Sequence, residues 1–203
     1  MVRPYARRVA NALYVLRHGE TSWSRERRHT GWTDIPLTDA GRLSARRVGV
    51  TLRELRDGRP WSAVVASPLS RALDTARLAG VEAACDDRLR EWNYGRYEGV
   101  TTDAIRAQRP GWDLWRDGCP DGESAAEVGA RVDAVLDEVV APALDAGDVL
   151  LVAHSHLLRV LAARWLELGP DGGRLFVLDP AGIGILGHEH GRRAMLGWNL
   201  ALP

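Results

Sequence analysis

The chain of 203 residues is 45% hydrophobic and 27% charged, and its 27 basic and 27 acidic residues cancel to a formal net charge of zero. This balance excludes a global attraction to nucleic acid or to an anionic membrane, so any anion site must be local. Every basic residue is arginine, and the absence of lysine excludes Schiff-base chemistry and the lysine-containing phosphate loop. Length and composition fit one globular domain or at most two small ones, and because no repeat, low-complexity tract or linker divides the sequence, we expect a single domain over residues 1–203.

The first predicted elements, in chain order, are a buried strand over 12–16 and an amphipathic helix over 39–55, with Thr38 or the next residue as its N-cap. A second apolar strand follows over 63–66. A serine and a proline come directly after it, which predicts a capped helix over 67–78 with proline at its first position.

The second half of the chain begins with a stretch, residues 86–122, that is rich in Trp, Arg and Gly and has no strong periodicity. We expect it to form an inserted loop-and-helix region over one end of the sheet, where the functional residues considered below would lie. The remaining predicted elements are a helix opened by the capping box Ser124-Ala-Ala-Glu127, a strand over 149–153, a helix over 156–166, and weaker strands over 176–178 and 183–186.

Continuous apolar strands that alternate with amphipathic helices indicate an α/β fold. We expect a three-layer sandwich, in which a mostly parallel central sheet has helices on both faces. The two cysteines, Cys85 and Cys119, form no C-x-x-C pair and are too few for a disulfide framework, which favours a reducing compartment. The apolar run over 10–16 is too short for a signal peptide, so we expect a cytoplasmic protein with no membrane partner and with residues 1–10 as a flexible N-terminal tail.

Three of the predicted strands end in polar residues that suit one kind of chemistry. The first runs into Arg17 and His18, the second into the helix that carries Arg71, and the strand over 149–153 into His154 and His156. The carboxyl ends of parallel strands lie along one edge of a sheet, where ligands of open α/β folds bind. Each residue alone has an ordinary structural explanation, but their joint placement predicts a phosphate pocket, because arginine forks and helix N-termini favour phosphoryl oxygens.

The order of the short motifs along the chain is more specific than any one of them. They are LRHGET at 16–21, HTGWTD at 29–34, LTDAG at 37–41, SPLSRA at 67–72, REWNYG at 90–95 with YEG at 97–99, GES at 122–124 and VAH at 152–154. This series resembles the histidine phosphatase superfamily, also called phosphoglycerate-mutase-like, over about residues 12–190.

The resemblance implies a role for each of five residues. His18 would be the nucleophile that takes the phosphoryl group, and it must be neutral to attack. Arg17, Arg71 and His154 would surround the equatorial oxygens and offset their charge in the transition state. Glu91 would protonate the leaving alkoxide and then activate water, and we expect burial beside the two neighbouring aromatic residues to raise its pKa. The resemblance implies neither a metal nor another cofactor.

Further positions match the family's substrate contacts less firmly. They are Ser24, Thr30, the amide of Gly31, Tyr94, His156 and Arg116, the last as a candidate for binding a second anionic group of the substrate.

The resemblance favours a phosphatase of the branch that includes sugar bisphosphatases and broad-specificity acid phosphatases, with a small phosphorylated metabolite, a sugar phosphate, as its substrate. The alternative is a phosphoglycerate mutase, but Thr102 stands where such mutases carry a lysine. Two competing hypotheses are a non-catalytic phosphate-binding module and a metal-dependent hydrolase built on His154-x-His156 or His188-Glu189-His190. The eight tryptophans fit a homodimer interface and core packing equally well.

Overall fold

The computed structural model describes residues 11–200; the predicted N-terminal tail over 1–10 and residues 201–203 lie outside this range. The described chain forms a six-stranded sheet in the order β3-β2-β4-β1-β5-β6. The strands are β1 (Leu13–Arg17), β2 (Ala63–Ala66), β3 (Ala84–Cys85), β4 (Val149–Ala153), β5 (Ile183–Glu189) and β6 (Arg192–Leu200). The first four are parallel, whereas β5 and β6 are antiparallel to their neighbours. The prediction of a mostly parallel sheet is confirmed.

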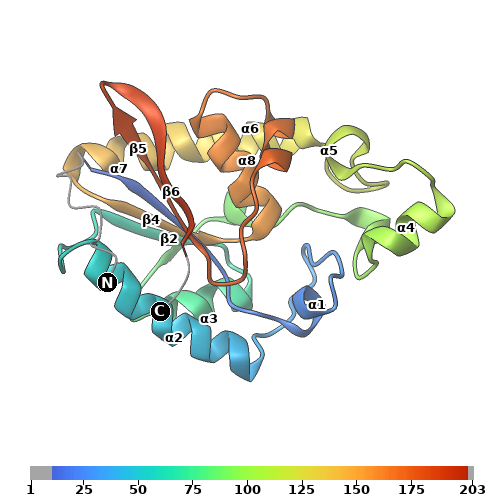
Figure 1. Cartoon of the computed structure of the whole chain (residues 1–203), viewed down its shortest axis with the longest axis horizontal. Coiled ribbons are helices and arrows are strands. Elements are labelled where there is room, and N and C mark those ends of the chain that lie inside the picture. The colour runs from blue at the N-terminus through green and yellow to red at the C-terminus, as the bar shows by residue number, and fades with distance from the viewer. Residues whose placement is uncertain (1–10, 201–203) are drawn as a thin grey trace.

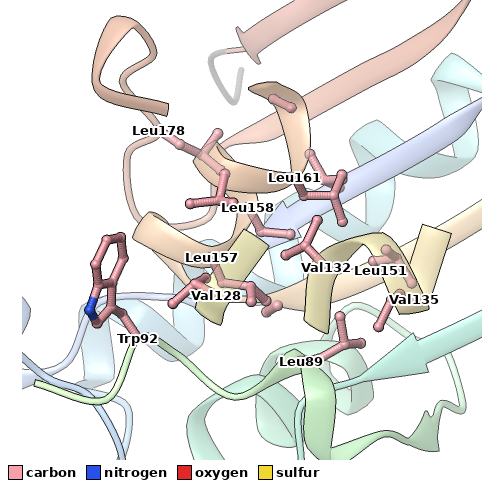
Figure 2. Close-up of a cluster of buried hydrophobic side chains, with 14 of the residues drawn as sticks. Leu89, Trp92, Val128, Val132, Val135, Leu151, Leu157, Leu158, Leu161 and Leu178 are labelled. Carbon is pink, nitrogen blue, oxygen red and sulfur yellow. The ribbon is translucent and has the colours of Figure 1, made fainter. Parts of the chain in front are cut away.

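Helices cover both faces of the sheet (Figure 1). On one face, α2 (Asp39–Leu55) and α3 (Ser70–Leu78) pack on an apolar cluster that includes Tyr14 and Leu150. On the other face, α6 (Ala125–Val135) and α8 (Ser155–Trp165) bury a larger cluster, part of which is drawn in Figure 2. Alternate side chains of β1 and β4 enter opposite clusters, which is why these strands read as continuous apolar runs. The predicted three-layer sandwich is confirmed.

The helix starts that were predicted from a cap within the same stretch of sequence are confirmed for α2 and α6. The Thr38 hydroxyl accepts from the amide of Gly41 at the start of α2, and both hydrogen bonds of the capping box between Ser124 and Glu127 are present at the start of α6. After α6 the helical path continues through a π-helical segment (Leu136–Val140) into α7 (Ala141–Ala146).

The predicted start of the second helix is wrong. Helix α3 begins at Ser70, and Ser67 and Pro68 lie outside it. The Ser67 hydroxyl lies 2.7 Å from Nε2 of His154. The first-turn amide of Ser70 donates instead to the carboxylate of Asp34, at 3.0 Å. A contact across 36 residues replaces the local cap, and sequence spacing does not reveal such a contact.

The end of the chain differs from the prediction in a similar way. Residues 176–178 form no strand, and they follow a 3₁₀ segment over Pro170–Leu175. The carbonyl of Val177 accepts from the indole of Trp198 instead of from a strand partner. The strand at 183–186 is confirmed but runs on to Glu189, and its partner β6 has a half-exposed pattern that carries little apolar signal.

A lobe extends beyond the carboxyl ends of the parallel strands (Figure 1). It contains α1 (Ser22–Arg25), a 3₁₀ turn at Gly95–Tyr97, α4 (Thr102–Gln108) and α5 (Leu114–Asp117). A further 3₁₀ turn, Asp87–Leu89, packs against α6 instead, with Leu89 in the core. Most of the lobe comes from the stretch over 86–122 that was predicted to be an insertion. Among residues 11–200 no helix is long and apolar enough to cross a membrane.

Candidate active site

Three neighbouring strands deliver their last residues to one place on the sheet edge. Arg17 of β1 pairs with Ala153 of β4, and β2 lies on the other side of β4. The next residues along β1 and β4 are His18 and His154, whose ring centroids are 5.1 Å apart. The structure therefore brings together His18 and His154, two of the three histidines that the sequence analysis placed after strand ends, at the carboxyl edge where they were expected.

His18 is held in one tautomer by its own backbone. Its Nδ1 lies 2.7 Å from the carbonyl oxygen of Gly19, so this nitrogen carries the proton and donates it. Burial, with the charges of Arg71 and Arg17, holds the pKa of His18 well below its usual range. The ring is consequently neutral near pH 7, and its Nε2 keeps a free lone pair.

His154 bridges Arg71 and Ser67. Nε of Arg71 donates to Nδ1 of His154 at 3.2 Å, which places the histidine proton on Nε2, facing the Ser67 hydroxyl. Burial, followed by the charge of Arg71, also holds the pKa of His154 well below its usual range. This ring is therefore neutral as well and has a fixed orientation.

Arg71 is fully buried and is oriented by main-chain oxygens. Its Nη1 donates to the carbonyl of Thr33 at 3.0 Å, and its Nη2 donates to that of Gly31 at 2.6 Å. The amide of Gly31 donates to a carboxylate oxygen of Glu98 at 2.7 Å. In this structure the carbonyl of Gly31 thus orients Arg71, whereas its amide is engaged by Glu98, and substrate contact by that amide stays a prediction. The sequence analysis assigned no role to Glu98.

Arg17 has a buried nitrogen without a partner. Its Nη1 donates to the carbonyl of Leu178 at 2.6 Å. Its Nε is buried and has no hydrogen-bond partner, which holds for no other buried side-chain nitrogen or oxygen in residues 11–200. Such unpaired buried groups are costly in folded proteins and mark places where a ligand or water completes the hydrogen bonding. The charge of Arg17 also lowers the pKa of His18, so the unpaired nitrogen belongs to a group that acts on this site.

Glu91 sits against the start of α8. Its carboxylate accepts from the amides of Trp92 and Leu157, both at 2.9 Å, and from the amide of His156 at 3.1 Å. Burial raises the pKa of Glu91, and the three amides and the charge of Arg71 offset part of the increase. The direction agrees with the prediction, and it favours the protonated acid.

Aromatic and imidazole rings form one wall beside Glu91. The Tyr94 hydroxyl lies 2.6 Å from Nδ1 of His156. The ring of Trp115 is 5.3 Å from that of His156, and the ring of His29 is 4.7 Å from that of Tyr94. Burial lowers the pKa of His29 to about 4 and that of His156 well below its usual range, so both rings are neutral near pH 7.

Three predicted binding residues are engaged elsewhere in the structure. The Ser24 hydroxyl accepts from the amide of Thr21 at 2.9 Å in the capping box of α1. The Thr30 hydroxyl donates to the carbonyl of Arg28 at 3.1 Å. Arg116 is exposed and donates to Asp117 at 2.8 Å. Their roles in substrate binding stay predictions.

The alternative metal site has no support in the described chain. His188 and His190 are exposed near the end of β5, at the opposite edge of the sheet from His18. Over residues 11–200, no three His, Cys, Asp or Glu side chains form a group that could hold a metal ion.

A neutral buried imidazole, the buried Arg71, the half-buried Arg17 and a buried acid at the carboxyl edge of a three-layer α/β sheet define an enzyme that handles phosphoryl groups. The chain belongs to the histidine phosphatase superfamily (branch 1), whose sequence profile matches residues 13–201. It is an enzyme of the histidine acid phosphatase type, a phosphoric monoester hydrolase.

Several known proteins are similar to this chain over most of its length. An acid phosphatase of Mycobacterium tuberculosis is 45% identical over 91% of this chain and 91% of its own. A sedoheptulose 1,7-bisphosphatase of Saccharomyces cerevisiae is 33% identical over 76% of this chain and 67% of its own. The solved structure of a Mycobacterium tuberculosis open reading frame product superposes with a TM-score of 0.88 at 44% identity, covering 94% of this chain and 97% of the other. Proteins named as phosphoglycerate mutases match as well.

Proposed function

We propose that the protein is a metal-independent phosphomonoesterase, and that it hydrolyses small phosphorylated metabolites of the sugar phosphate class through a phosphohistidine at His18. The observation that carries this proposal is the 2.7 Å contact between Nδ1 of His18 and the carbonyl oxygen of Gly19. Because a carbonyl oxygen can only accept, the contact assigns the proton to Nδ1 and leaves Nε2 free to attack. Arginine side chains supply the positive charge that a metal ion supplies in other phosphoryl-transfer enzymes.

The reaction has two steps with one proton donor. Nε2 of His18 attacks phosphorus, the bond from phosphorus to the ester oxygen breaks, and the Glu91 proton goes to the leaving alkoxide. The carboxylate of Glu91 then takes a proton from water, the hydroxyl attacks phosphorus, and the bond from phosphorus to His18 breaks. Inorganic phosphate leaves, and Glu91 is again protonated. Arg17, Arg71 and His154 would stabilise the charge on the equatorial oxygens in both steps.

The substrate class is inferred from relatives and from the residues of the chain. The similar proteins include an acid phosphatase and a sugar bisphosphatase. A mutase is the second candidate, because similar proteins with that name exist. The absence of lysine and the Thr102 position favour hydrolysis. The cytoplasmic location and the homodimer stay predictions.

The test is to trap the intermediate. We expect the enzyme, quenched during turnover of a radiolabelled phosphate ester, to carry label that is labile in acid and stable in alkali, as a phosphohistidine is. His18→Ala should carry no label and lose at least about a thousandfold in kcat. His190→Ala, which changes an exposed histidine, is the matched control and should behave as the wild type.

Two outcomes would overturn the proposal. One is label that persists on the His18→Ala variant, and the other is turnover by the wild type without any labelled intermediate. The mutase alternative is decided with 3-phosphoglycerate and its bisphosphate primer, where appreciable isomerisation would contradict the preference for hydrolysis.

A further inference from the structure

Arg159 is a half-buried arginine that lies one helical turn after His156 on α8. Its Nε donates to the carbonyl of Gly173 at 3.1 Å, and its guanidinium carbon lies 4.8 Å from the ring centroid of Trp115. Within residues 11–200 it has no carboxylate partner, and its two terminal nitrogens make no hydrogen bond. By contrast, Arg164 on the same helix donates to both carboxylate oxygens of Asp133.

Contiguous contacts connect Arg159 to the candidate acid. The ring of Trp115, on which the guanidinium stacks, is 5.3 Å from the ring of His156. The amide of His156 donates to the carboxylate of Glu91. The charge of Arg159 also lowers the pKa of His156 and of Arg17, so it acts on the same site. If Glu91 protonates the leaving oxygen, the leaving part of the substrate lies on this side of the pocket.

Arg159 carries a positive charge in a wall whose other polar side chains are neutral. The wall that Arg159 shares with His156, His29 and Tyr94 is otherwise neutral near pH 7. The stacked ring and the hydrogen bond to Gly173 hold the guanidinium in place and leave its terminal nitrogens available. A preorganised arginine fork without an acidic partner suits a phosphate or a carboxylate, to which it can donate two parallel hydrogen bonds.

We propose that Arg159 binds a second anionic group, a phosphate or a carboxylate, on the leaving part of the substrate. This inference rests on the proposed function, and it narrows the substrates to metabolites that carry two anionic groups. It assigns to Arg159 the role that the sequence suggested for Arg116, whose guanidinium is paired with Asp117 at the surface.

The test compares substrate selectivity in Arg159→Gln and the wild type. The probes are fructose 1,6-bisphosphate, 3-phosphoglycerate and glycerol 3-phosphate, and the last has no second anion. We expect the ratio of kcat/KM between a two-anion probe and glycerol 3-phosphate to fall about 10- to 100-fold, mainly through KM, as the loss of a charge-assisted hydrogen-bonded pair predicts. If the ratio falls more for fructose 1,6-bisphosphate, Arg159 binds a phosphate. If it falls more for 3-phosphoglycerate, Arg159 binds a carboxylate.

Arg164→Gln is the matched control, since it removes an arginine from the same helix, and its selectivity should equal that of the wild type. Arg159→Lys should recover part of the lost selectivity, because it restores the charge without the fork. A uniform loss on all three probes in Arg159→Gln, or a selective loss in Arg116→Gln instead, would overturn the inference.

Direct binding separates this inference from the proposed function. Calorimetric titration of fructose 1,6-bisphosphate into His18→Ala, and into the same variant with Arg159→Gln, requires no turnover. We expect the second change to weaken binding about 10- to 100-fold. Equal affinities of the two variants would contradict the role of Arg159, even if His18 is shown to carry the phosphoryl group. Weaker binding by the variant that also lacks Arg159 would support that role, even if no phosphohistidine forms.

Discussion

At the scale of single residues, burial sets the protonation states of both His18 and Glu91, the nucleophile and the acid of the proposed reaction. It disfavours charge, so it lowers the pKa of His18 and raises the pKa of Glu91. A neutral histidine is the nucleophilic form, and a protonated glutamic acid is the proton-donating form. The arginines keep their charge because a guanidinium is not deprotonated in proteins. Burial therefore gives the histidine and the glutamic acid the protonation states that the chemistry requires, while the arginines stay charged.

The pH dependence follows from these two directions. Activity should be lost as the pH falls through the pKa of His18, which lies well below 6.5, because a protonated ring cannot attack. It should also be lost as the pH rises through the pKa of Glu91, which is raised above 4.5, because the carboxylate cannot donate. Profiles of kcat/KM against pH on an alkyl phosphate, which report the groups of the free enzyme, would show both limbs.

Glu91→Gln should remove the alkaline limb of this profile and lower kcat on an alkyl phosphate about 100- to 10,000-fold. On nitrophenyl phosphate, whose leaving group needs little protonation, the loss should be much smaller. Glu82→Gln, on the surface between α3 and β3, is the control and should match the wild type. Full turnover of the alkyl phosphate by Glu91→Gln would show that another group supplies the proton.

The site residues that sequence reasoning identified follow strand ends, whereas those that it missed depend on contacts between residues distant in sequence. Arg17, His18 and His154 follow strand ends, so a pattern of strands is enough to place them. Glu98 and Arg159 act through contacts with Gly31 and Trp115, which are distant in sequence. The one local signal for Arg159 was its place one turn after His156.

At the scale of elements, the loop over 30–33 orients Arg71 through its carbonyls, and Glu98 fixes the loop through its amides. The same carboxylate oxygen of Glu98 accepts from the amides of Gly31 and Thr33, and the carbonyls of these two residues accept from Arg71. The space is tight, because a Cβ added at Gly31 would lie 2.6 Å from the carbonyl oxygen of Trp92. Glu98 is therefore a positioning residue for a buried cation.

Glu98→Ala should let the loop relax and shift Arg71, which we expect to lower kcat about 10- to 100-fold, since misplacement by about 1 Å has effects of this size. Glu98→Gln keeps one acceptor oxygen and should recover part of the loss. Glu26→Ala removes an exposed carboxylate that pairs with Arg28 and serves as the control. If Glu98→Ala changed the unfolding temperature but left kcat intact, the carboxylate would be structural only.

The elements show the same limit of sequence reasoning. The capping box at the start of α6 was predictable because its two partners are three residues apart. The start of α3 was not, because Asp34 supplies the acceptor and His154 engages Ser67. Strand β6 was missed because its half-exposed side chains show little apolar contrast, and its place is fixed by pairing with β5.

At the scale of the whole molecule, the two ends of the parallel strands differ: function is expected at their carboxyl ends and a stabilising cluster lies at their amino ends. The carboxyl edge carries the candidate site, and a buried ion pair ties the amino edge together. Asp148, just before β4, accepts from the amide of Ala12 at 2.9 Å and from Nε of Arg56 at 3.1 Å. Arg56 in turn stacks on Trp61, with its guanidinium carbon 3.4 Å from the ring centroid. This cluster joins the end of α2 to the starts of β1 and β4.

Asp148→Asn should therefore separate stability from activity. Both Asp148 and Arg56 are at most 3% exposed, and removal of one partner leaves a buried charge uncompensated, which costs about 3–5 kcal/mol. Urea unfolding should show this loss, whereas Asp74→Asn, in a partly exposed pair with Arg77, should cost less than about 1 kcal/mol. Because the change lies at the amino edge, kcat measured on the folded fraction at low temperature should equal that of the wild type. A fall in kcat without a fall in stability would mean that the two edges are coupled through the sheet, and that the amino edge also orients His18 and His154.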